Sequence, residues 1–264
     1  MDMTGIIIAV AIIGGLGLIV SIFLSFFAKK FAVEVDEREV AVIEALPGNN
    51  CGGCGYPGCS GLAAAIVKGE APVSGCPVGG KSVADEVAKI MGVDAGDYVK
   101  TVAFVKCNGT CGATHQLYDY TGPKDCRAAI VAPGKGPKSC SYGCLGFGSC
   151  VKVCDKDAIT IVDGIAKIDE SKCGSCGQCV KVCPMGLIEI IPAESNVRVA
   201  CSSKDKGPQV MKACTVGCIG CGLCVKNCEY DAITVTDNIA HIDYSKCTKC
   251  GACAAKCPKK IINI

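Results

Sequence analysis

Cys173-Gly-Ser-Cys176-Gly-Gln-Cys179-Val-Lys-Val-Cys183-Pro184 is the stretch that decides the fold. Its spacing is C-x2-C-x2-C-x3-C-P, in which three cysteines hold one [4Fe–4S] cluster and the fourth holds a neighbouring cluster. The same run recurs at Cys247–Pro258 and, with Glu229 in place of the proline, at Cys218–Cys228. Because the fourth cysteine of each run ligates the other cluster, two runs together make one small domain.

These runs belong to an internal repeat in which matching residues lie 74 positions apart along the chain. Asp157-Ala-Ile-Thr160 returns as Asp231-Ala-Ile-Thr234. The cysteine pairs that keep the same offset are Cys144 and Cys218, Cys150 and Cys224, Cys154 and Cys228, Cys173 and Cys247, and Cys183 and Cys257. The sequence therefore predicts an α+β fold that contains two tandem bacterial-ferredoxin-like modules of βαβ type, at residues 140–192 and 193–264.

The first run of the repeat lacks one ligand. Phe147 stands where Cys221 stands in the second copy, and Cys140 lies four residues ahead of Cys144. We therefore expect Cys140 to supply the missing thiolate, although Cys214, its counterpart in the second copy, lies beside a run that is complete without it. Crossing the fourth cysteines predicts four clusters. Their ligand sets are Cys140, Cys144, Cys150 and Cys183; Cys154, Cys173, Cys176 and Cys179; Cys218, Cys221, Cys224 and Cys257; and Cys228, Cys247, Cys250 and Cys253.

A fifth [4Fe–4S] site is expected in a small helical domain at residues 31–97. Its motif is Cys51-x2-Cys54-x4-Cys59-x16-Cys76, and its glycine-rich loop lets backbone N–H groups approach a cluster. Helices are predicted near residues 32–46, 61–68 and 81–92. A zinc ion is the alternative to a cluster at this site, because zinc is also bound by C-x2-C pairs. Three cysteines at two-residue intervals, as in the ferredoxin runs, favour a cluster.

The connecting segment at residues 98–139 leaves one question open. Cys107, Cys111 and Cys126 are candidate ligands of a sixth cluster. Cys126 precedes Cys140 by almost the same distance along the chain as Cys201 precedes Cys214, so each module carries a similar leading pair. That parallel fits a buried structural role as well as a ligand role.

The composition excludes several classes of protein. An odd count of 25 cysteines argues against a secreted disulfide framework, and low-potential clusters belong in a reducing compartment. The formal charge is +2, and five clusters at about −2 each would bring it to roughly −8. No basic patch is left for nucleic acid. No nucleotide-binding fingerprint or catalytic motif is present either.

Residues 1–30 predict a transmembrane anchor. Residues 4–28 carry no charge, and an apolar helix of this length matches the thickness of a bilayer. Asp2 and the long apolar run argue against a secretory signal. Lys29 and Lys30 follow directly, so we expect a single pass with the N-terminus outside and the iron–sulfur domains in the cytoplasm.

One membrane helix, the Cys51–Cys76 motif and then ferredoxin runs, in this order, resemble the B subunit of the Rnf complex, the ion-translocating electron transport complex of bacteria. The resemblance covers the whole chain and fits the longer form found in anaerobes. It implies that reduced ferredoxin donates electrons, which pass from cluster to cluster to membrane subunits and a flavin-carrying, NAD-reducing subunit while Na⁺ or H⁺ is pumped. The alternatives are an electron-transfer subunit of another membrane-associated oxidoreductase, such as a hydrogenase or reductase, and a zinc-stabilised membrane scaffold.

Overall fold

The computed structural model describes the backbone of residues 3–30 and 36–264, and in the first helix the side chains of residues 4, 7 and 12–27. Its helical elements are α1 (Met3–Lys30), α2 (Glu37–Ala45), α3 (Gly58–Val67), α4 (Gly80–Met91), α5 (Cys126–Ala129), the 3-10 turn η1 (Pro133–Lys135), α6 (Ser149–Lys152), α7 (Gln178–Val182), α8 (Gly207–Ala213), α9 (Leu223–Lys226) and α10 (Ala252–Ala255). Its strands are β1 (Thr101–Val105), β2 (Ile159–Val162), β3 (Ile165–Ile168), β4 (Ile188–Pro192), β5 (Arg198–Val199), β6 (Ile233–Thr236), β7 (Ile239–Ile242) and β8 (Ile262–Asn263).

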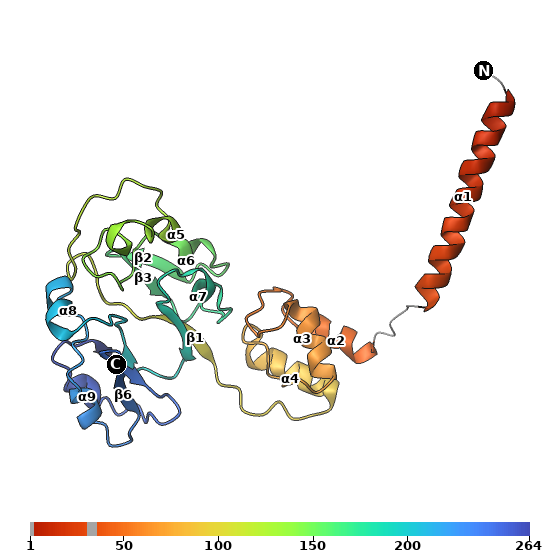
Figure 1. Ribbon diagram of the computed structural model, residues 1–264. Coiled ribbons are helices and arrows are strands. Elements are labelled where there is room, and N and C mark those ends of the chain that lie inside the picture. The colour runs from red at the N-terminus through yellow and green to blue at the C-terminus, as the bar shows by residue number, and fades with distance from the viewer. Residues whose placement is uncertain (1–2, 31–35) are drawn as a thin grey trace.

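The N-terminal segment forms one helix, α1, which extends away from the other elements (Figure 1). From Ile12 to Phe26 its large apolar side chains are mostly well exposed. Among the residues that the structure describes, however, no helix is both long and apolar enough to cross a membrane. The predicted helix is therefore confirmed, and its predicted transmembrane character is not.

Helices α2, α3 and α4 form a compact four-cysteine domain. Asp36 caps α2, because its side chain accepts a hydrogen bond from the backbone N–H of Arg38 at 2.9 Å. Val42, Leu62 and Val87 are almost fully buried where the three helices meet. The three helices lie where the sequence predicts them, except that residues 32–35 of the first lie outside the described residues.

Each ferredoxin-like module contains two small antiparallel sheets. β2 pairs with β3 in module 1 and β6 with β7 in module 2, and both hairpins have the same register: Ile159 faces Ile168, and Ile233 faces Ile242. The predicted duplication is therefore confirmed down to the pairing of single residues. The predicted βαβ type is wrong in detail, because the described strand pairs are all antiparallel.

Module 1 takes its first strand from the segment that we expected to be only a connection. β1 pairs with β4, with Thr101 opposite Pro192 and Val105 opposite Ile188. The boundary predicted at residue 140 therefore leaves out a strand of this module. In module 2 the matching pair is β5 with β8. The long insertion between β1 and the first cysteine run hides this correspondence in the sequence.

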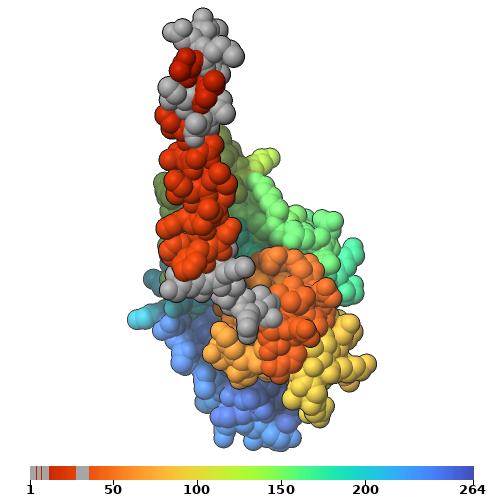
Figure 2. Space-filling view, turned by 90° about the vertical axis from the view of Figure 1, so that its right-hand side faces the viewer, coloured from red at the N-terminus to blue at the C-terminus, as the bar shows by residue number. Residues whose placement is uncertain are grey.

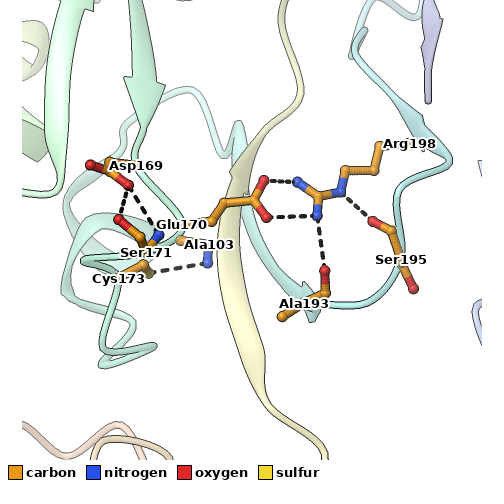
Figure 3. Close-up of polar contacts among 8 residues, drawn as sticks. All are labelled: Ala103, Asp169, Glu170, Ser171, Cys173, Ala193, Ser195 and Arg198. Atoms are coloured by element: carbon orange, nitrogen blue, oxygen red, sulfur yellow. Dashed lines mark hydrogen bonds and ion pairs between the residues drawn. The ribbon is translucent and has the colours of Figure 1, made fainter.

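The two modules are joined along β1. Ala103 and Val105 pack into the core of module 1, whereas Phe104 packs against the core of module 2. Arg198 of β5 is 7% exposed, and its guanidinium lies 5.4 Å from the ring centre of Phe104. It also forms an ion pair with Glu170 of module 1 (Figure 3).

Backbone carbonyl groups complete the surroundings of this arginine. Its Nε donates to the carbonyl oxygen of Ser195 at 2.5 Å, and a terminal nitrogen donates to Ala193 at 3.4 Å. A buried guanidinium with these partners is satisfied, and removing it would leave Glu170 without its partner. The contact therefore fixes the two modules against each other.

Candidate iron–sulfur sites

The four-cysteine domain brings its predicted ligands to one end of α3. Cys51 and Cys54 lie in the loop before α3, Cys59 is in its first turn, and Cys76 returns from the loop before α4. Burial raises the pKa of the Cys76 thiol, and the neighbouring Cys59 and Cys54 raise it further. The Asn50 side chain accepts a hydrogen bond from the N–H of Cys59 at 2.8 Å and so fixes the loop against the helix.

The inner site of module 1 consists of Cys154, Cys173, Cys176 and Cys179, which line one cavity. Burial raises the pKa of Cys179 to about 11, with further contributions from the other three thiols. The backbone N–H of Ala158 points at Cys154 Sγ at 3.4 Å. The N–H of Ala103 points at Cys173 Sγ at the same distance (Figure 3). These four cysteines therefore lie around one cavity, and their role as cluster ligands stays a prediction.

The outer site of module 1 differs from the prediction in one ligand. Burial raises the pKa of Cys150 to about 12, and the thiols that raise it further are Cys144, Cys126 and Cys183. Cys140, which we expected here, lines a different cavity. Cys126, not Cys140, therefore lies beside Cys144, Cys150 and Cys183.

A polar contact explains why Cys126 reaches this position. Its N–H donates to the hydroxyl of Ser149 at 2.8 Å, and that hydroxyl donates to Asp125 at 3.1 Å. Ser149 begins α6, the helix that carries Cys150, so α5 is held against α6 at the ligand position. Phe147, which occupies the place of the missing cysteine, instead packs on the ring of Tyr120, with 5.2 Å between the ring centres.

Module 2 contains two candidate cluster sites, which we call the near site and the far site. The near site consists of Cys218, Cys221, Cys224 and Cys257, which line one cavity as predicted. Burial raises the pKa of Cys224 to about 11, with Cys218 and Cys221 adding to the shift. The far site has Cys247, Cys250 and Cys253 on one ligand loop, and Cys228 packs against the same core cluster.

A cavity between the modules is lined by four cysteines that the sequence analysis did not group. We call it the bridging cavity, and its cysteines are Cys107, Cys140, Cys201 and Cys214. Burial raises the pKa of Cys140, and Cys107 and Cys214 raise it further. Burial raises the pKa of Cys201 to about 11, and Cys218 and Cys140 also raise it. Thiols of this set therefore raise the pKa of other thiols in the set, as neighbouring groups of like charge do.

The bridging cavity follows the internal repeat, because each module contributes one matching pair. Cys107 comes two residues after β1, and Cys201 comes two residues after β5. Cys140 and Cys214 each precede the first cysteine of a run by four residues. The N–H of Cys144 points at Cys107 Sγ at 3.3 Å, and the N–H of Cys218 points at Cys201 Sγ at the same distance. These repeated offsets are the sequence signal that could have revealed the set.

The three cysteines considered for a sixth site, Cys107, Cys111 and Cys126, are not brought together. Cys107 lines the bridging cavity and Cys126 lies beside Cys150. Cys111 is exposed, and its N–H donates to the carbonyl oxygen of Asp163 at 2.9 Å. The three cysteines of this candidate set therefore lie in different places.

A buried lysine lines the bridging cavity. Lys138 is 6% exposed, and its ammonium group donates to the carbonyl oxygens of Gly164 at 2.7 Å and Gly109 at 3.3 Å. Its positive charge opposes the increase in pKa that burial causes at Cys144 and Cys214. A cation at this position offsets part of the negative charge of thiolate ligands on both sides.

The cysteine groups offer thiols to a cluster. In the described residues, no group of three or more His, Cys, Asp or Glu side chains is arranged to hold one metal ion. A single zinc ion would need thiolates about 2.3 Å from its centre, whereas a [4Fe–4S] cluster takes its four thiolates at four separate irons. Four soft thiols with backbone N–H groups aimed at the sulfurs are the donor set that such a cluster requires.

The four-cysteine domain lies on the side of module 1 where α7 and β1 lie (Figures 1 and 2). Gln178 of α7 donates to the carbonyl oxygen of Cys51 at 2.8 Å, and Lys181 reaches the carbonyl oxygens of Cys51 and Gly52 at 3.4 Å. Cys51 also lines the cavity of the inner site. Two candidate cluster sites therefore adjoin across this contact.

Gly53→Ala is expected to force this contact open. A Cβ at Gly53 would lie 2.7 Å from the carbonyl oxygen of Cys176, which is too close for unbonded atoms. We expect weaker magnetic coupling between the two reduced clusters, measured as reduced splitting of their EPR signals. Gly174→Ala is the matched control, because its Cβ would lie 3.9 Å from Val78 at the same contact. Equal spectra for both variants would contradict this account.

Comparisons with known proteins follow the same division of the chain. Family models match residues 46–78 (putative Fe-S cluster), 166–189 (4Fe-4S binding domain) and 217–261 (4Fe-4S dicluster domain). The chain is 50% identical over 262 residues to the B subunit of the Na(+)-translocating ferredoxin:NAD(+) oxidoreductase complex of Acetobacterium woodii, covering 99% of this chain and 78% of the relative.

Two further relatives are similar along almost their whole length. The B subunit of the ion-translocating oxidoreductase complex of Methanosarcina acetivorans is 43% identical, with 97% of each chain covered. The B subunit of the proton-translocating ferredoxin:NAD(+) oxidoreductase complex of Clostridium ljungdahlii is 44% identical, over 97% of this chain and 91% of the relative.

Proposed function

The chain belongs to the B-subunit family of ion-translocating ferredoxin:NAD oxidoreductase complexes, and from this premise we propose that it is their iron–sulfur electron-transfer subunit. The observation that carries the proposal is the grouping of the cysteines. All 25 lie in the described residues 36–264, and we assign 24 of them to six sets of four. When bound, a [4Fe–4S] cluster takes up and returns one electron without rearranging its ligands.

We propose six [4Fe–4S] clusters, one more than the five that the motifs predict. Cys51, Cys54, Cys59 and Cys76 hold the first; the inner and outer sites of module 1, the bridging cavity, and the near and far sites of module 2 hold the others. In the outer site, Cys126 takes the place of Cys140. The support is the shared cavities and the mutual effects of the thiols on their pKa values.

The six sites form a row from the four-cysteine domain to the end of module 2. Cys51 lines the cavity of the inner site, and α6 ends two residues before Cys154 and carries Cys150, which joins the inner site to the outer site. The 3.3 Å contacts of Cys107 with Cys144 and of Cys201 with Cys218 then connect the bridging cavity to a site in each module. Without the bridging cavity, the row would have a gap between the modules.

The donor and the remaining partners follow from the names of the relatives. We propose that reduced ferredoxin donates electrons and that membrane subunits and a flavin-carrying, NAD-reducing subunit receive them. Relatives named for Na⁺ and for protons are 50% and 44% identical to this chain, which supports placing the cation pathway in other subunits. The chain itself contributes cysteine ligands and no nucleotide-binding fingerprint.

We also propose that α1 holds the chain to the inner membrane as a single pass, with the N-terminus outside. Exposed apolar side chains, such as Ile13 (72%) and Ile19 (67%), are unfavourable in water and favourable in lipid. Lys29 and Lys30 end the apolar segment and favour a cytoplasmic position for the domains that follow.

One experiment tests the donor and the anchor together. The full chain, purified anaerobically and mixed with lipid vesicles, is expected to float with them, and reduced ferredoxin is expected to bleach its absorbance at about 400 nm. A chain that lacks residues 1–30 should bleach equally and remain in solution. Failure of ferredoxin to reduce a chain that dithionite reduces would refute the electron-transfer role, and flotation of the shortened chain would refute the anchor.

A further inference from the structure

The duplication allows the same surface to be compared in the two modules. In module 1, the ligand loop with Cys176 and the start of α7 face the four-cysteine domain. Gln178 and Lys181 hydrogen-bond to that domain, and the backbone of Gly53 lies against Cys176. A neighbouring redox site therefore covers this surface in module 1.

The matching surface of module 2 is uncovered in the described residues. Cys250, the counterpart of Cys176, is exposed, whereas Cys176 is half-buried. Ala252 and Ala255 stand at the places of Gln178 and Lys181, and both are exposed. In place of side chains that hold a domain of the same chain, module 2 has two small apolar residues beside an exposed ligand.

Its charge also differs from that of its counterpart. Residues 246–260 contain five lysines and no acidic residue, whereas residues 172–186 contain two lysines and no acidic residue. Lys249 replaces Ser175, which is 5% exposed and hydrogen-bonds to Thr101 at 2.6 Å. A cluster of about −2 in the far site, together with the carboxylates of Glu194 and Asp243, would still leave a local excess of roughly one positive charge.

Two carboxylates lie near these lysines. Glu194 forms an ion pair with Lys249 at 3.1 Å, and Asp243 lies 3.9 Å from Lys246. Both pairs are largely solvent-exposed, so each is worth little and leaves the lysines available to a partner. Lys256 and Lys260 are exposed and form no ion pair within the described residues.

We propose that this surface is the docking site of a small acidic one-electron carrier of the ferredoxin class. We call it the C-terminal lysine face, and it consists of Lys246, Lys249, Cys250, Ala252, Ala255, Lys256 and Lys260. The proposal rests on the proposed electron-transfer function and adds where the donor binds. The lysines attract and orient the acidic carrier, and the alanines allow close approach to the far site. The carrier loses one electron and the chain gains one, and no covalent bond or proton is exchanged.

The test compares two triple charge reversals in the full chain with its clusters bound. Lys246→Glu/Lys249→Glu/Lys256→Glu changes the C-terminal lysine face. Lys68→Glu/Lys81→Glu/Lys89→Glu makes the same change in net charge on exposed positions of the four-cysteine domain. The probe is a purified acidic two-cluster bacterial ferredoxin, reduced beforehand, and the readout is the second-order rate constant of reduction by stopped-flow absorbance at low and high salt.

We expect the first variant to be reduced at least about tenfold more slowly at low salt, with a weaker salt dependence. The second variant should stay close to the unmodified chain. Reduction by dithionite and the iron content should be unchanged in both, which shows that the clusters are intact. Equal rates for the unmodified chain and the first variant, or equal slowing in both variants, would overturn the docking site alone. A chain that dithionite reduces and ferredoxin does not would overturn the proposed function, and the docking site with it.

Discussion

Replacing Cys201 and Cys214 by serine is expected to lower the iron content from about 24 to about 20 atoms per chain. Both side chains line the bridging cavity, and a cluster that loses two of its four thiolates is not retained. Iron and acid-labile sulfide should fall together, by four each. The EPR spectrum of the reduced chain should also lose the coupling between the two modules, because the site between them is gone.

Cys111→Ser is the control for this experiment. Cys111 is exposed and lies outside all six sets, so its replacement should leave the iron content unchanged. About 20 irons in the unmodified chain, with no loss in the double variant, would show that the bridging cavity holds buried thiols only. A loss of four irons in Cys111→Ser would show that the sets are assigned wrongly.

Removing the clusters from the intact chain is expected to unfold both modules. Their helices are mostly four to seven residues long and their sheets have two strands, and such elements are marginal in water by themselves. Many members of their core clusters are cysteines, among them Cys150, Cys179, Cys224 and Cys253. The free energy of cluster binding is therefore largely the free energy of folding.

Hydrogen exchange measured by mass spectrometry checks this expectation. After anaerobic treatment with an oxidant and a chelator, amides in β2, β3, β6 and β7 should lose their protection. The four-cysteine domain should keep more of its protection, because α2, α3 and α4 bury Val42, Leu62 and Val87 against one another. Native-like protection of the two modules after iron removal would contradict the account.

Local spacing in the sequence was enough to predict most of the ligand groups. Three cysteines at two-residue intervals lie on one loop and the first turn of a short helix, so chain geometry alone brings them together. The left-handed backbone at Gly177 and Gly251, with φ of 71° and 76°, makes this turn possible in both modules. The same local order placed the helices of the four-cysteine domain.

Ligands that come from distant segments could not be predicted in the same way. Cys126 reaches the outer site because Ser149 and Asp125 hold α5 against α6, which no spacing rule contains. Cys107 reaches the bridging cavity because β1 pairs with β4, and most of module 1 lies between these two strands in the sequence. The expectation for Cys140 failed because it considered only the nearest run, whereas the cavity lies between two modules.

The row of sites also follows the order in which a ribosome makes the chain. The first set is complete at residue 76, the two sets of module 1 at 179 and 183, the bridging set at 214, and the two sets of module 2 at 253 and 257. Domains generally fold from the N-terminus during synthesis. The sites are thus completed in the order of the row, except that the far site of module 2 is complete four residues before the near site. Iron–sulfur assembly can therefore proceed from one end of the row towards the other while translation continues.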